Sequence, residues 1–134
     1  MDAYPDWLLA HGSALDQKMG LEFLEISGER TVARMPVEGN TQPFGLWHGG
    51  ASCVLAETLG SVAAFSAIEG RGAAFGVDLN ATHHKAVRSG WVTGTATQLS
   101  LGGRLASYQI VLTDDAGDLV CTARLTVFLR RDPA

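Results

Sequence analysis

The chain has 134 residues, of which 46% are hydrophobic and 18% charged, and its formal net charge at pH 7 is −4. This length suits one domain over residues 1–134 with its own core, and the composition is typical of globular rather than disordered proteins. The acidic balance argues against the broad basic surface that nucleic acid or an anionic membrane would require, so we expect neither as a partner.

Cysteine usage and the N-terminus set the expected environment. Cys53 and Cys121 are far apart and form no CxxC pair, which disfavours a disulfide framework and a zinc knuckle. Residues 1–20 contain no apolar run of signal-peptide length, so we expect a cytoplasmic protein. Residues 44–65 are apolar, but Glu57 and several hydroxyl side chains interrupt them, and we expect no transmembrane helix.

The first third of the chain predicts a short helix followed by a β-hairpin. Apolar residues at helical spacings indicate a helix over about residues 6–18, ended by a turn at Gly20. An alternating stretch from Leu21 and a second one over Thr31–Val37 flank the turn residues Ser27–Glu29, which is typical of a hairpin. Residues 38–45 contain Gly, Asn and Pro and predict a loop.

A long helix is predicted after His48, because apolar residues recur there at three- and four-residue spacings over a stretch much longer than a strand. Beyond Gly72 the period changes to two, which predicts strands at residues 73–84, 91–101, 104–113 and 119–129. A helix that is apolar nearly all round must be buried, and a curved antiparallel sheet is its natural cover. The predicted fold class is α+β, with an antiparallel sheet wrapped around one central helix.

Strict alternation assigns the residues of the strand at 73–84 to two faces. We expect one face to carry Phe75, Val77, Leu79, Ala81 and His83, and the other to carry Gly76, Asp78, Asn80, Thr82 and His84. Because neighbouring strand residues point to opposite faces, the two histidines cannot readily bind one ion, and we expect no metal site.

One carboxylate interrupts the predicted apolar helix. The stretch FGLWHGGASCVLAETLGSVAAF places Glu57 between Leu55 and Leu59. Removing an unpaired carboxylate from water is costly, so such a residue either turns to solvent or lies where its chemistry is needed. The small and apolar neighbours favour a functional role for Glu57.

Three stretches, QPFGLWHGGASCVLAETLGS, GVDLNATHHKAVRSGWVTG and SLGGR, resemble the hotdog-fold acyl-CoA thioesterases. The resemblance is to the PaaI-like branch that contains 4-hydroxybenzoyl-CoA thioesterase of the Arthrobacter type, the enterobactin proofreading thioesterase and 1,4-dihydroxy-2-naphthoyl-CoA thioesterase. It covers nearly all of the chain after Met19. It implies a hotdog fold and hydrolysis of an acyl-CoA thioester.

The same residues suit this chemistry independently of the resemblance. Thioester hydrolysis needs a group that attacks the carbonyl or activates water, and donors that stabilise the developing oxyanion. Glu57 can supply the first. The leading N–H groups of a helix lack intrahelical partners and lie at the positive end of its dipole, and Gly49 and Gly50 let a ligand approach them.

Gly49 and Glu57 cannot act on the same carbonyl from one helix. Eight residues at a rise of ~1.5 Å separate them by ~12 Å. If both act on one thioester, they must come from two subunits, with antiparallel helices across a twofold axis. The resemblance implies the same arrangement, a homodimer with shared active sites, and further assembly into a homotetramer.

The resemblance also implies roles for individual residues. Glu57 is the catalytic carboxylate, as nucleophile or as general base, and the Gly49 N–H polarises the carbonyl. Gln42 helps to orient substrate or water, and His48 holds the preceding loop and contacts the thioester region. Ser61 lies one helical turn beyond Glu57 and is expected to line the acyl pocket or to hydrogen-bond the carboxylate.

The acyl group is expected to meet apolar side chains. Phe44, Trp47, Val62 and Phe65 can form a flat pocket, which favours an aromatic or hydroxyaryl acyl group without excluding a medium-chain one. His83 is expected either to face this pocket or to be a satisfied core histidine.

Glycines and cations are the candidates for binding CoA. Gly102, Gly103 and Arg104 combine backbone that a ligand can approach with a guanidinium that pairs with phosphate. Lys85 and Arg88, which follow the strand at 73–84, are expected to serve the nucleotide phosphates.

Two other functions are compatible with this architecture. A hotdog dehydratase or hydratase needs a His and an acid in a different arrangement from that around His83 and His84. A non-catalytic acyl-CoA-binding module normally needs an output domain, and the sequence has no helix-turn-helix or basic segment. Acyl carrier protein can replace CoA as the carrier, and no cofactor is expected because CoA is part of the substrate.

Overall fold

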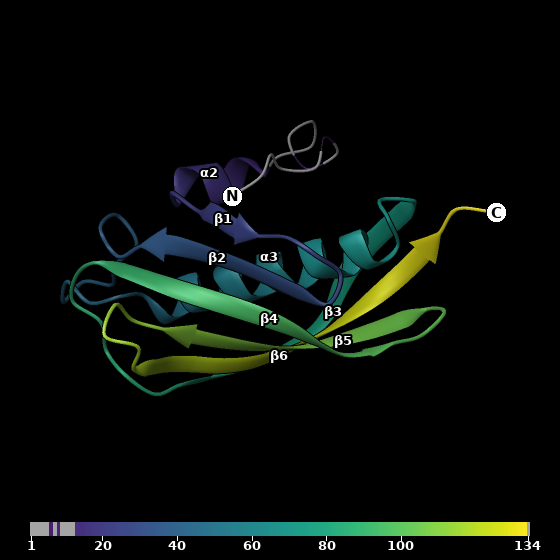
Figure 1. The fold of residues 1–134 in the computed structure, drawn as a ribbon. Helices are drawn as coiled ribbons and strands as arrows, with labels where there is room; N and C mark the ends of the chain where they lie inside the picture. The colour runs from purple at the N-terminus through teal and green to yellow at the C-terminus, as the bar shows by residue number, and fades with distance from the viewer. Residues whose placement is uncertain (1–5, 7, 9–12, 134) are drawn as a thin grey trace.

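An antiparallel sheet that encloses one long helix dominates the computed structural model, which describes residues 6, 8 and 13–133 (Figure 1). The elements of these residues are, in chain order, α2 (Ala14–Lys18), β1 (Glu22–Glu25), β2 (Arg30–Pro36), α3 (Gly49–Ala67), β3 (Gly72–His83), β4 (Trp91–Leu101), β5 (Leu105–Thr113) and β6 (Leu119–Arg131). The predicted α+β hotdog architecture is confirmed. Of the helix predicted over residues 6–18, the part before residue 13 lies largely outside the described residues.

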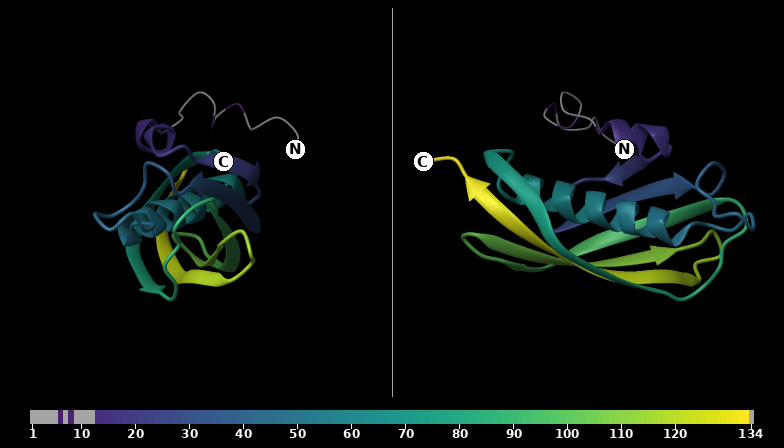
Figure 2. Two further views of the ribbon diagram at one scale, coloured as in Figure 1. Left: turned by 90° about the vertical axis from the view of Figure 1, so that its left-hand side faces the viewer. Right: turned by 180° about the vertical axis from the view of Figure 1, so that it is seen from behind.

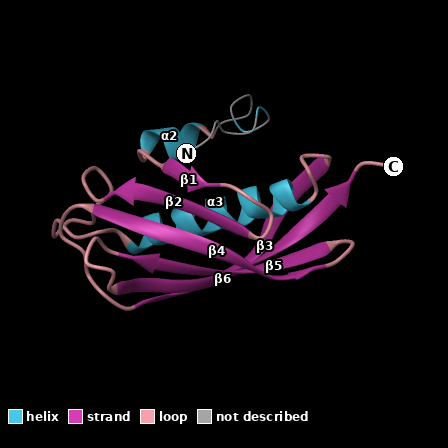
Figure 3. Cartoon of the chain, in the orientation of Figure 1, coloured by secondary structure: helices cyan, strands magenta, loops and turns pink. Residues whose placement is uncertain are grey.

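The sheet brings together strands that are distant in the sequence. Its order is β1-β2-β4-β5-β6-β3, and every neighbouring pair is antiparallel. β3 follows α3 and crosses the sheet to pair with β6, so β3 forms one edge and β1 the other. Figure 2 shows the sheet curving around α3, and Figure 3 shows the helix lying lengthwise along the strands.

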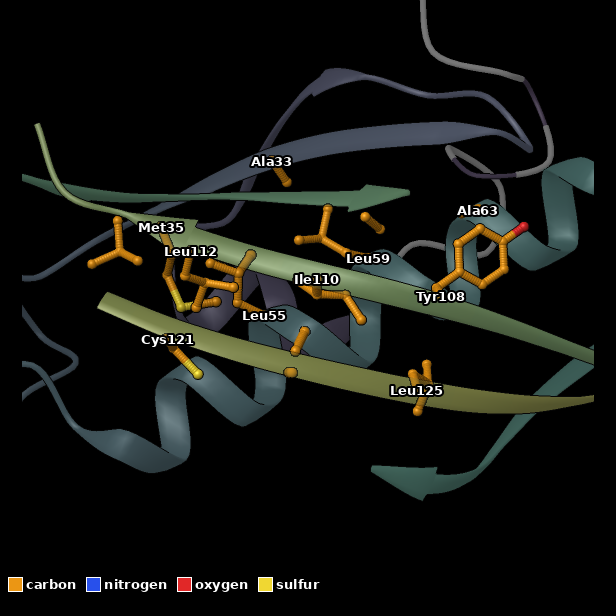
Figure 4. Packing of buried hydrophobic residues seen from close by; sticks show 14 of the residues in the cluster. Ala33, Met35, Leu55, Leu59, Ala63, Tyr108, Ile110, Leu112, Cys121 and Leu125 are labelled. Atoms are coloured by element: carbon orange, nitrogen blue, oxygen red, sulfur yellow. The ribbon is translucent and has the colours of Figure 1, made fainter. Parts of the chain in front are cut away.

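The core lies between α3 and the concave face of the sheet (Figure 4). Leu55 and Leu59 of α3 are fully buried. The helix can approach the sheet closely because a β-carbon on Gly60 would collide with Leu125, and one on Gly94 would collide with Leu59. With 19 residues and a mean hydropathy of 1.3, α3 is also long and apolar enough to span a membrane, a property that core helices share.

β3 contains an irregularity next to its midpoint. Gly76 lies opposite Val127 of β6, whereas Asp78 lies opposite Thr126. Val77 is therefore an extra residue in β3, which is the definition of a β-bulge.

The bulge corrects the predicted faces of β3. Phe75 pairs with Phe128 and both are exposed (55% and 42%), whereas Leu79, beyond the bulge, packs against the core. The prediction that Phe75 shares a face with Leu79 and His83 is therefore wrong, because alternation holds only along a regular strand. Gly76, which was expected on the opposite face from Leu79, lies against α3.

We expect Leu59→Ala to lower the free energy of unfolding by about 2–5 kcal/mol, because it leaves a cavity between α3 and β4. Leu24→Ala is the matched control, since Leu24 is 41% exposed, and should cost less than about 1 kcal/mol. Urea denaturation of both variants at equal protein concentration measures the difference. Equal losses would contradict the assignment of Leu59 to the core.

Candidate active site

The first turn of α3 is organised by His48, its N-cap residue. The backbone of His48 is extended (φ −76°, ψ 128°), and its Nδ1 accepts a hydrogen bond of 2.7 Å from the Gly50 N–H. The His48 N–H donates to Asn40 O at 3.0 Å, which ties the preceding loop to the start of the helix. His48 thus connects this loop to the helix, while its contact with a thioester stays a prediction.

Gly49, the first residue of α3, presents a backbone donor. The Gly50 N–H is bound by His48 Nδ1, and the Ala51 N–H donates to His48 O at 2.9 Å. The Gly49 N–H has no acceptor among the residues that the structure describes. The His83 ring lies against Gly49, since a β-carbon there would come within 2.9 Å of His83 Nε2. A carbonyl that approaches Gly49 would therefore meet this donor beside an imidazole.

An open cavity of about 420 Å³ adjoins this donor. Its volume falls within the ~300–1,000 Å³ typical of small-molecule sites. Five of the predicted site residues meet in its wall, and the full lining consists of Gln42, Leu46, Trp47, Gly49, Ser52, His83, His84, Lys85, Ala86 and Val120.

The loop before α3 is fixed by the Gln42 side chain. Gln42 Oε1 accepts hydrogen bonds from the N–H groups of Phe44, at 2.6 Å, and Leu46, at 3.2 Å. The amide nitrogen is therefore the end of this side chain that can reach a substrate. Trp47 is buried (6% exposed), and its indole N–H donates to Ser52 Oγ at 2.6 Å, so it forms a fixed wall of the cavity.

Glu57 lies in the middle of α3 on the side that faces β3. Its carboxylate packs so closely on Gly76 that a β-carbon there would collide with Oε2. Ser61 Oγ lies 3.4 Å from the same oxygen, as the spacing of one helical turn predicts. The side chain is only partly buried, and because β3 is an edge strand, the carboxylate lies near the open edge of the sheet.

Within one chain, the structure does not bring Glu57 to the cavity. α3 runs unbroken from Gly49 to Ala67, which places Glu57 ~12 Å along the helix from Gly49. Phe44 and Phe65 are also separated, because Phe65 belongs to the last turns of α3 and Phe44 is 82% exposed in the loop before the first turn. One chain alone therefore does not form the predicted acyl pocket.

Lys85, a predicted phosphate ligand, already has carboxylate partners. Its Nζ lies 2.6 Å from both Asp114 Oδ2 and Asp118 Oδ2, at the turn between β5 and β6. Hydrogen bonds to these two carboxylates raise the pKa of Lys85, and the hydrogen bond from Lys85 lowers the pKa of Asp114. A phosphate would have to compete with two aspartates for this ammonium group, and the role of Lys85 in CoA binding stays a prediction.

The predicted glycine–arginine turn lies at the other end of β6 from the cavity. The carbonyls of Gly102 and Gly103 accept hydrogen bonds from Arg131, at 2.9 and 3.1 Å. A β-carbon on Gly103 would meet nothing within 4 Å, and Arg104 is exposed, so this turn has an open surface. Arg88 is exposed in the loop between β3 and β4, at the cavity end of the sheet.

Three residues that build the site were missed by the sequence-based predictions. Ser52 fixes Trp47, and Asn40 anchors the loop by donating from Nδ2 to Met19 O and Pro36 O, both at 2.8 Å. Gly76 lies against the catalytic candidate Glu57. Only Gly76 had a signal, because a glycine inside an apolar strand often marks a bulge or a close approach.

Comparisons with known proteins show which family the chain resembles. Residues 44–121 match the model of the thioesterase superfamily. The chain is 44% identical to the 1,4-dihydroxy-2-naphthoyl-CoA hydrolase of Escherichia coli, over 81% of this chain and 80% of that protein. It is 45% identical to the proofreading thioesterase EntH of Klebsiella pneumoniae, over 80% of this chain and 79% of that protein. A solved thioesterase from Haemophilus influenzae matches with a TM-score of 0.88 and 33% identity, over 97% of this chain and 93% of that one.

We expect Lys85→Met to raise the pKa of the Asp114 carboxyl toward its ordinary value of ~3.9, because the hydrogen bond that stabilises the carboxylate is lost. In the unchanged protein the lowered pKa means that ionised Asp114 stabilises the fold above ~3.9, and that this contribution is lost as pH falls through the folded-state pKa. An NMR titration of the Asp carboxyl carbons measures the shift, with Lys18→Met as the control. An Asp114 titration that does not move in Lys85→Met would contradict the ion pair.

Proposed function

The chain belongs to the thioesterase superfamily, and from this premise we propose that it hydrolyses an acyl-CoA thioester with Glu57 as the catalytic carboxylate and the Gly49 N–H as the oxyanion donor. The observation that carries the proposal is a partly buried carboxylate on an otherwise uncharged core helix whose first N–H is left without an acceptor among the described residues. In a site that excludes water, the carboxylate and the N–H would each stabilise the transition state more strongly than they would in solution.

The reaction needs one carboxylate and one water molecule. Glu57 either takes a proton from water as that water attacks the thioester carbon, or attacks this carbon itself and forms a mixed anhydride that water then cleaves. In both routes the C–S bond breaks, the sulfur leaves as the CoA thiol with a proton, and the acyl group leaves as a carboxylate. The Gly49 N–H would stabilise the negative charge on the carbonyl oxygen.

We propose that the active site is shared between two copies of the chain that pair through β3. This twelve-residue strand is a long unpaired edge of the sheet, and such edges are normally covered in a native assembly. Glu57 contacts β3 at Gly76, and Gly49 contacts it at His83. An antiparallel β3–β3 pair centred near Leu79 and Asn80 would place Gly76 opposite the partner's His83, and therefore Glu57 beside the partner's Gly49.

The same pairing would bring predicted CoA-binding residues of the two chains close together. The turn of Gly102, Gly103 and Arg104 lies at the end of the sheet where β3 begins, whereas Arg88 follows the end of β3. Antiparallel pairing would bring the beginning of β3 in one chain to the end of β3 in its partner. Arg104 of one chain and Arg88 of the other would then flank one nucleotide site. Assembly of two such dimers into a homotetramer is part of the proposal.

The acyl group that we propose is aromatic, hydroxyaryl or medium-chain. Phe65 lies two turns beyond Glu57 on α3, and Phe44 is an exposed aromatic side chain beside the cavity loop. A shared site would bring Phe65 of one chain toward Phe44 and Trp47 of the other, which forms the flat pocket that one chain lacks. The named E. coli relative acts on an aromatic acyl-CoA, which supports this class.

The decisive test measures thiol release from a panel of aryl, short-, medium- and long-chain acyl-CoAs. Glu57→Gln should lower kcat by at least about 10³-fold, because the amide neither attacks nor accepts a proton. Glu38→Gln, at an exposed glutamate outside the site, is the matched control. Full activity in Glu57→Gln would refute the mechanism, and release from no substrate by the unchanged protein would refute the function.

The donor role of Gly49 can be isolated with two substitutions at one position. Proline is tolerated at the first position of a helix, and the extended backbone of His48 suits a following proline, so Gly49→Pro should fold. It removes the N–H, whereas Gly49→Ala adds a β-carbon against His83 but keeps the N–H. We expect kcat of Gly49→Pro to be about 10²–10³-fold below that of Gly49→Ala. Equal activities would show that this N–H is not the donor.

Mixing the two inactive variants tests the shared site. A mixed dimer of Glu57→Gln and Gly49→Pro chains contains one site with both defects and one site with none, provided that each site draws on both subunits. Co-expression with two affinity tags isolates this dimer, and its activity should return to about half of that of the unchanged dimer. If each site lies within one chain, no activity returns.

A further inference from the structure

We propose that Gly76 is a positioning residue for the reaction. Because Gly76, at the bulge of β3, has no side chain, it leaves the space that the Glu57 carboxylate occupies and so directs Oε1 toward the substrate. The inference rests on the proposed function, because it concerns how the catalytic carboxylate of that reaction is held.

The contact itself is the first observation. A β-carbon on Gly76 would collide with Glu57 Oε2, whereas Oε1 would lie 3.2 Å from it. Ser61 Oγ approaches the same oxygen, Oε2, at 3.4 Å. Gly76 and Ser61 therefore confine Oε2 between the strand and the helix, which leaves Oε1 as the oxygen that faces away from these two residues. Oε1 is accordingly the atom that we assign to attack on carbon or to proton abstraction from water.

The bulge explains why a glycine is at this place. If β3 were a regular strand with no bulge, the alternation set by Leu79 would point Val77 and Phe75 at α3, and a bulky side chain would occupy the position of the carboxylate. With the bulge, Gly76 lies against Glu57, and Phe75 instead pairs with Phe128 on the opposite face, where both are exposed. Bulges near active sites commonly redirect side chains in this way.

Replacing Gly76 with alanine should lower the rate of the reaction without lowering the stability of the fold. The φ angle of Gly76 lies outside the left-handed region, so alanine is compatible with the backbone. The group that a β-carbon would displace is the flexible end of one side chain and not backbone. Glu57 can therefore swing away without disturbing the core, but the carboxylate must move by about 1 Å or more, which is enough to cost ~10²-fold in rate.

The experiment compares Gly76→Ala with the unchanged protein and with Ala74→Gly, which alters the same strand two residues before Gly76. We expect kcat of Gly76→Ala to fall by about 10²-fold with KM nearly unchanged, because the carboxylate and not the CoA site is displaced. The melting temperature should not fall, since alanine reduces the conformational entropy of the unfolded chain. Ala74→Gly should keep its activity. A crystal structure of Gly76→Ala should show the Glu57 carboxylate displaced.

A second substitution, Glu57→Asp, provides a measurement that would not change if the role of Gly76 were purely structural. Glu57→Asp withdraws the carboxylate by one methylene, about 1.5 Å, and so clears the β-carbon introduced at residue 76. The loss caused by Gly76→Ala should therefore be at least about threefold smaller when Glu57→Asp is already present, which is a coupling that a double-mutant cycle measures.

The outcomes distinguish this inference from the proposed function. Thiol release that depends on Glu57 but stays within about threefold of normal in Gly76→Ala would overturn the positioning role and leave the function intact. Strictly multiplicative losses in the double variant, or an undisplaced carboxylate in the crystal structure, would also overturn it. An unchanged protein that hydrolyses no acyl-CoA would overturn the proposed function, and the catalytic role of Gly76 with it.

Discussion

The close packing of α3 against the concave face of the sheet is the constraint on which the rest of the structure depends. Leu55 and Leu59 are completely buried, and glycines on both sides of the interface remove the β-carbons that would hold the two layers apart. A nineteen-residue helix packed in this way is fixed in its orientation. Groups carried by α3 consequently keep constant positions relative to the strands.

Two positions on β3 contact the two groups to which we assign the chemistry. Gly49 lies against His83 near the end of this strand, and Glu57 lies against Gly76 beside its bulge. The donor and the carboxylate are thus attached to the same edge strand, on a helix too rigid to bring them together. If both groups act on one thioester, a single chain supplies half of two sites rather than the whole of one, which is why we place the reaction between two copies.

The architecture was predictable from the sequence because its signals are periodic and long. The helix after His48 and the strands that follow it depend on repeated spacings, and local exceptions do not hide them. Glu57 was noticed as a candidate for the opposite reason, as the one charge in the long helix. The faces of β3 were not predictable, because a single extra residue at Val77 reverses the alternation and leaves no mark in composition. Lys85 illustrates a second limit, since its partners Asp114 and Asp118 are about thirty residues away along the chain and a sequence pattern does not reveal them.

The edge position of β3 has a consequence for how the assembly is specified. Two identical strands that pair about a twofold axis can slip relative to each other, and a slip of two residues keeps every side chain on its face while moving the partner by ~7 Å. Such a dimer would bury a similar area and form the same kind of backbone hydrogen bonds, yet Glu57 would no longer meet the partner's donor. The affinity of one chain for the other therefore does not by itself determine which dimer would be active. The sequence of β3 must also select one register for the pairing. The bulge at Val77 is the feature of β3 that makes one register different from the next.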